Sequence, residues 1–167
     1  MTTTLATAAF VSLVALAAAS DVRSRRVSNG LVLVIFLAGI ARQVLSLDIG
    51  AVVLGIAGTA VGLAILLPAF AARWVGGGDV KLLAALGAWL GPWGVLVGGL
   101  YGIALGGLLA ALMAIVGGAG REVARNMSAA LVTLSSPVAP RRRRGLIVPL
   151  ALPLAIGCTI VQLGGVP

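Results

Sequence analysis

The sequence predicts an all-α, polytopic membrane protein with about six transmembrane helices, of which the fourth is short. Three observations lead to this prediction. Of the 167 residues, 60% are hydrophobic and only 10% are charged, whereas soluble domains are about 25% charged. Several apolar runs reach the roughly 20 residues that a helix needs to cross a bilayer. Most of the basic residues lie in segments between these runs, as in the cytoplasmic loops of membrane proteins.

The six apolar segments cover residues 5–20, 31–47, 49–72, 80–90, 93–116 and 146–163. The first ends in small residues like those of a signal-peptide cleavage site. However, no Lys or Arg precedes it, so we interpret it as a transmembrane helix. The fourth stops at Gly91-Pro92 and, at about 1.5 Å per residue, covers roughly half of the hydrocarbon core. We expect residues 1–167 to form a single membrane-embedded domain.

The distribution of charge predicts the orientation of the chain. If Arg23 and its basic neighbours are cytoplasmic, alternation of the segments places all but one of the 12 basic residues, Arg42, on that side. Both termini are then outside. The long loop over residues 117–145 is expected to be cytoplasmic and to contain an amphipathic helix. We expect the basic loops to contact anionic lipid and expect no nucleic-acid partner.

The residue types that are absent restrict the chemistry. The chain has no His, and its one cysteine, Cys158, lies in an apolar run and is interpreted as a small packed side chain. This excludes Ser-His-Asp triads, Cys-His pairs and His-ligated metals. We expect no metal and no organic cofactor. Small residues at every fourth position, from Gly94 to Gly118 and again at Gly58 and Gly62, predict close helix packing.

Two aspartates are the strongest candidates for chemistry. Asp21 ends the first segment and Asp79 begins the fourth, and both fall on the predicted cytoplasmic side. Such a pair suits aspartyl proteolysis, in which one carboxylate activates water and the other carboxyl protonates the scissile carbonyl. Helix polarity favours Asp79, at a helix start, as the base and Asp21, at a helix end, as the acid.

The acidic residues also have structural interpretations. Asp79 fits a helix N-cap, a position that favours Asp. Asp48 is interpreted as a turn residue of an outer loop, and Glu122 as a solvated acid among arginines.

Three segments resemble prepilin peptidases, which are membrane aspartyl proteases. GGGDVKL (residues 76–82) resembles their GxGD signature. DVRSRRVSN (residues 21–29) resembles a second motif, in which an aspartate closes the first helix and a basic stretch ends in Pro-Asn. IVPLALPLAIG (residues 147–157) resembles the proline-containing last helix. The three elements occur in the same order as in that family.

The resemblance implies that Asp21 and Asp79 are catalytic, and that Gly76, Gly77, Gly78 and Lys81 shape the site around Asp79. It implies removal of the short basic leader from type IV pilin-like precursors at the cytoplasmic face of a bacterial or archaeal membrane. The short form resembles enzymes of Flp/Tad-type pilus systems.

The chain departs from the family pattern in two ways. Ser28 stands where the family usually has Pro, and the N-terminal extension with paired cysteines found in larger members does not precede the first segment. That extension is associated with methylation of the new N-terminus, so we expect no methyltransferase activity.

Two other functions fit the same composition. The first is a small transporter or channel component, a class that often shows repeated halves and charges near the bilayer midplane. Here the two acids lie at one membrane face and no clear repeat is visible. The second is a structural membrane subunit, for which substitution of Asp21 or Asp79 by Asn would leave function unchanged.

Overall fold

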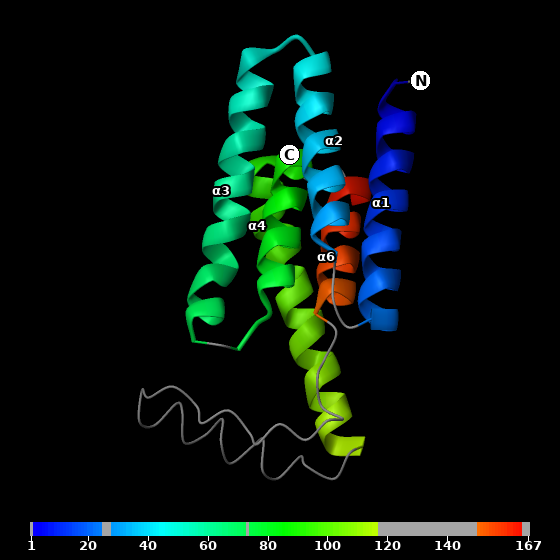
Figure 1. Ribbon diagram of the computed structural model, residues 1–167, viewed down its shortest axis with the longest axis vertical. Coiled ribbons are helices and arrows are strands. Elements are labelled where there is room, and N and C mark those ends of the chain that lie inside the picture. Colours follow the sequence, from blue (N-terminus) through cyan, green and yellow to red (C-terminus); the bar gives the residue numbers. More distant parts are fainter. Residues whose placement is uncertain (1, 25–27, 73, 117–149, 165–167) are drawn as a thin grey trace.

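The computed structural model describes residues 2–24, 28–72, 74–116 and 150–164, and the regular structure in these ranges is helical. The helices are α1 (Thr2–Ser24), α2 (Asn29–Leu45), α3 (Ile49–Ala71), α4 (Gly77–Val116) and α6 (Ala151–Gly164). They form an upright bundle in which α4 packs against α2, α3 and α6, and α1 packs against α2 and α6 (Figure 1). The predicted all-α class is confirmed. The predicted amphipathic loop lies outside the described residues.

A break at Gly91 folds α4 into two antiparallel legs. Gly91 has φ 69° and ψ 180°, a conformation that is essentially restricted to glycine. In a straight helix Leu83 and Gly99 would be about 24 Å apart, yet a Cβ on Gly99 would lie 3.4 Å from a methyl group of Leu83. The legs, residues 77–90 and 92–116, correspond to the fourth and fifth apolar segments. The first leg begins at Gly77 rather than at residue 80.

Side chains of α2 bond to carbonyl groups at this break. In a continuous helix the carbonyl of Ala88 would accept a hydrogen bond from residue 92, but Pro92 has no N–H. The Gln43 amide donates to that carbonyl at 3.2 Å in a buried position. Arg42 approaches the next carbonyl, of Trp89, at 3.5 Å. The polar end of α2 therefore stabilises the turn between the two legs of α4.

Glycines bring α3 and α6 to backbone distance from α4. A Cβ on Gly58 of α3 would collide with the carbonyl oxygen of Gly87, and one on Gly62 would lie 2.5 Å from the carbonyl oxygen of Leu83. In the second leg of α4, Gly98 and Gly102 approach the backbone of α6 in the same way, whereas Gly106 packs against the side chains of Leu150 and Pro153. The predicted packing role of the small residues is confirmed at these positions, and Gly118 lies outside the described residues.

The core is centred on the first leg of α4, in which residues 82–89 are all buried. Trp89 donates its indole N–H to the carbonyl of Ile35 at 2.8 Å. Its ring also meets the edge of Phe10, with ring centroids 5.5 Å apart. This one side chain therefore links α4 to α1 and α2, which hold the other residues of the candidate site.

The outer surface suits a lipid environment, because large apolar side chains are exposed along the described helices. Segments of α1, α3 and α4 are long and apolar enough to cross a membrane, whereas α2 and α6 are apolar but shorter. The chain is therefore a helical membrane protein, with three helices of this length in the part of the chain that the structure describes. Six separate spans remain a prediction.

Polar caps start two of the helices. Ser28 accepts a hydrogen bond from the amide of Leu31 at 3.2 Å and begins α2. Its φ of −67° is close to the value that proline imposes. The backbone at position 28 therefore has the conformation that the proline of the family motif would require. Asp48 accepts a hydrogen bond from Gly50 at 2.8 Å and begins α3, as expected for a turn residue.

Candidate active site

Asp21 is a buried acid in the last turn of α1. Only 6% of its surface is exposed, because α1 packs against α6 at this level. Its carboxylate accepts a hydrogen bond from the backbone amide of Ala151, at the start of α6. The Oδ2 atom has no hydrogen-bond partner in the part of the chain that the structure describes. A buried oxygen without a partner is costly, so it is available to bind a proton, water or substrate.

Asp79 is the third residue of α4 and is partly buried. Its carboxylate accepts a hydrogen bond from the amide of Gly76, and its own amide bonds to the carbonyl of Gly76 at 3.2 Å. Asp79 is therefore not the N-cap residue itself, but it satisfies the amide of the residue that precedes the helix. The structural interpretation of Asp79 is correct in part. One carboxylate oxygen engaged with an amide does not exclude a chemical role for the other.

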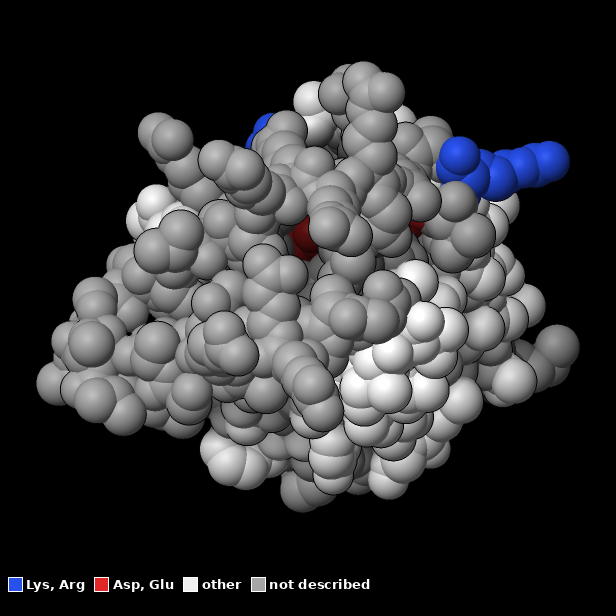
Figure 2. Space-filling view, turned by 90° about the horizontal axis from the view of Figure 1, so that it is seen from below, with Lys and Arg blue, Asp and Glu red and all other residues white. Residues whose placement is uncertain are grey.

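The two aspartates lie at the same end of the bundle. Figure 1 shows the end of α1 and the start of α4 at the lower end, although the residues are 58 positions apart in the sequence. Their carboxylates are close enough to repel each other when both are charged. Viewed onto this end, acidic side chains appear only as small recessed patches between other atoms (Figure 2). Two carboxyl groups at one end, one buried and one half-buried, can act as acid and base on a water molecule that lies between them.

The glycines before Asp79 permit close approach rather than an unusual backbone. Among the described glycines, only Gly91 has a positive φ. A Cβ on Gly76 would lie 3.3 Å from Oδ2 of Asp79, and one on Gly77 would lie 3.3 Å from the ring of Phe70. Gly78 lies in the first turn of α4. Larger residues at 76 or 77 would therefore press on the carboxylate or on α3.

Lys81 links the two motifs that contain the aspartates. Its ammonium group donates to the side-chain oxygen of Asn29, the first residue of α2, at 3.3 Å, and both side chains are exposed. Sequence reasoning identified Lys81 but assigned no role to Asn29. Because Asn29 ends the second motif, its position could have indicated a role in the site.

The remaining candidates lie elsewhere. Asp48 caps α3 at the opposite end of the bundle from the aspartates. Cys158 is fully buried against Gly98, which confirms a packed side chain. Glu122 and the arginines of residues 121–144 lie outside the described residues.

Comparison with known proteins identifies the family. The model of the type IV leader peptidase family matches residues 8–116, which include Asp21 and Asp79. This is well over half of the chain, although α6 lies beyond the matched region. No match was found among curated proteins or among solved structures.

Proposed function

Because the chain belongs to the type IV leader peptidase family, we propose that it is an aspartyl endopeptidase whose catalytic pair is Asp21 and Asp79. Membership makes the chain a peptidase, and it implies a pilin-like precursor as substrate. The observation that supports the proposed pair best is the buried oxygen of Asp21, which has no partner among the described residues and lies at the same end of the bundle as Asp79. A structural pair would be expected to satisfy that oxygen.

In the proposed mechanism, Asp79 removes a proton from water and Asp21 donates one to the scissile carbonyl. The first turn of α4 favours negative charge on Asp79, and the last turn of α1 disfavours it on Asp21. Repulsion between the carboxylates favours a single shared negative charge. After attack of water on the carbonyl carbon, proton transfer from the pair to the leaving nitrogen completes cleavage.

We further propose that the reaction takes place at the cytoplasmic face of the membrane. Arg23 is exposed two residues after Asp21, and basic residues near spans mark the cytoplasmic side. The product would be a pilin-like protein freed of its short basic leader. The resemblance of this short chain to the enzymes of Flp/Tad-type systems supports a precursor of that class.

The test is cleavage of a Flp/Tad-type precursor by purified protein in liposomes, with Asp21→Asn, Asp79→Asn and the matched control Asp48→Asn. Loss of an acid or base lowers rates by roughly 10²–10⁴-fold, so we expect such losses for the first two variants. Asp48→Asn should cleave like wild type, because Asn also caps helices well. Circular dichroism and thermal unfolding verify folding of each variant.

Wild-type cleavage with undiminished activity in either active-site variant would refute the two-aspartate mechanism. Failure of the wild type on all precursors of this class would refute the proposed substrate.

A further inference from the structure

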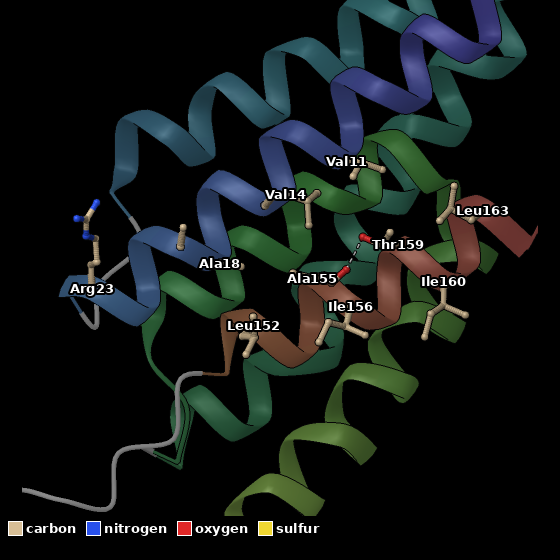
Figure 3. A pocket seen from close by; sticks show the side chains of 12 residues that line it. Val11, Val14, Ala18, Arg23, Leu152, Ala155, Ile156, Thr159, Ile160 and Leu163 are labelled. Carbon is tan, nitrogen blue, oxygen red and sulfur yellow. Dashed lines mark hydrogen bonds between the residues drawn. The ribbon is translucent and has the colours of Figure 1, made fainter.

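An open apolar groove runs between α1 and α6 (Figure 3), and Arg23, two residues after Asp21, lines one end of it. Its volume is about 700 Å³. Side chains from both helices line it, including Val11 and Val14 of α1 and Ile156 and Ile160 of α6. The hydroxyl group of Thr159, which also lines the groove, donates to the carbonyl of Ala155 at 2.7 Å. The groove is therefore apolar along most of its length.

The groove extends along the bundle axis rather than across it. Its lining on α1 begins at Val11 and ends at Arg23, a rise of about 18 Å. That length is more than half of a hydrocarbon core of about 30 Å. Arg23 is the charged residue at one end, and a cation there belongs at the boundary with water. An occupant must therefore be apolar over several helical turns, and the end of the groove at Arg23 is exposed.

The polar end of the groove coincides with Asp21. On α1, Asp21 lies between the lining residues Ala19 and Arg23. On α6, the amide that bonds to Asp21 belongs to Ala151, directly before the lining residue Leu152. A segment lying in the groove would thus leave it at the level of the proposed catalytic acid.

The lining fits a helix better than lipid chains. Half of the residues on the α1 wall are alanines, Ala15, Ala18 and Ala19, and Ala155 lines the groove on α6. Walls of small residues allow the backbone of another helix to approach closely in a membrane. Flexible lipid chains gain nothing specific from such walls.

We propose that this groove binds the apolar helix of the precursor and delivers the peptide bond at its cytoplasmic end to Asp21 and Asp79. The proposal rests on the proposed function and adds the path by which the substrate enters, laterally between α1 and α6.

The first experiment fills the groove. Ala15 is exposed and lines it, whereas Ala9 is exposed on the same helix but does not line it. Ala15→Trp should raise KM for a full precursor by about tenfold or more with little change in kcat, because it removes binding energy shared by ground and transition states. Ala9→Trp should cleave like wild type. A short leader peptide without the apolar helix should be cut equally by both variants.

The second experiment locates the substrate directly. A photo-crosslinking amino acid replaces Ile160, which lines the groove and is 50% exposed, or Ile56 of α3, which is 58% exposed. The precursor is added to protein that also carries Asp79→Asn, so that it remains uncleaved. We expect cross-links to the precursor from position 160 and not from position 56.

The outcomes separate the two proposals. Normal wild-type cleavage with an unchanged KM for Ala15→Trp, or labelling of position 160 by lipid alone, would overturn the groove proposal and leave the peptidase proposal intact. Absence of wild-type cleavage of every precursor of this class would overturn the proposed substrate and, with it, the groove proposal.

Discussion

Substitution of Gly62 by alanine should displace the start of α4 and slow cleavage without unfolding the protein. A Cβ at this position would lie 2.5 Å from the carbonyl oxygen of Leu83, and ordinary contact begins at 3.4 Å. The two helices must therefore separate by about 0.9 Å at this contact. The obstacle is backbone, which no side-chain rotation relieves. Leu83 lies one helical turn after Asp79, so the displacement reaches the proposed catalytic carboxylate.

The structure indicates the size of the effect. A misplacement of about 1 Å in a catalytic group lowers rates by roughly 100-fold, so we expect kcat for Gly62→Ala to fall by about that factor. Overpacking costs about 1–3 kcal/mol, and the higher helix propensity of alanine offsets up to about 1 kcal/mol of it. The variant should therefore remain folded, with a modestly lower unfolding midpoint.

The assay is single-turnover cleavage of the precursor, with thermal unfolding measured on the same samples. Gly107→Ala is the matched control, because a Cβ at Gly107 meets nothing within 4 Å. It should cleave at the wild-type rate and unfold at the same or a slightly higher temperature. A wild-type kcat for Gly62→Ala would refute the argument that this close contact positions Asp79.

Three further predictions concern contacts that link the helices. Gln43→Met removes the buried hydrogen bond to the carbonyl of Ala88 and should destabilise the protein by about 1–3 kcal/mol, measured by chemical unfolding in detergent. Ser28→Ala removes the cap of α2 and should cost about 1 kcal/mol, whereas Ser28→Thr should cost little; thermal unfolding compares the two. Lys81→Met and Asn29→Ala should each lower stability slightly and should couple by about 0.5–1 kcal/mol in a double-mutant cycle, because their hydrogen bond is exposed; full additivity would show that the bond contributes nothing.

Much of the fold could be predicted from the chain because the membrane limits the choices. Backbone groups in lipid must bond within their own segment, so each long apolar run becomes a helix, and the segments predicted over residues 31–47 and 49–72 match α2 and α3 to within two residues. Gly91-Pro92 marked the break in α4, because proline lacks an N–H and glycine alone adopts the observed backbone. The extension of α1 to Ser24, past Asp21, was not predicted.

The candidate site was predictable in its residues but not in its geometry. Asp21 and Asp79 stood out because ionisable groups in apolar helices are costly. No local pattern indicated that the amide of Ala151, 130 positions away, bonds to Asp21, or that Lys81 bonds to Asn29. These contacts depend on which helices are neighbours.

The sequence by itself therefore determined the helices, the break at Gly91 and the two aspartates as candidates. Only the tertiary structure decided which helices are neighbours, that α6 covers Asp21, and that α1 and α6 leave an apolar groove between them. The physical reason is that lipid is as apolar as the helix surfaces, so hydrophobicity places a segment in the membrane without selecting its partner. That selection depends on matching shapes, such as Gly58 against Gly87, which belong to two segments at once.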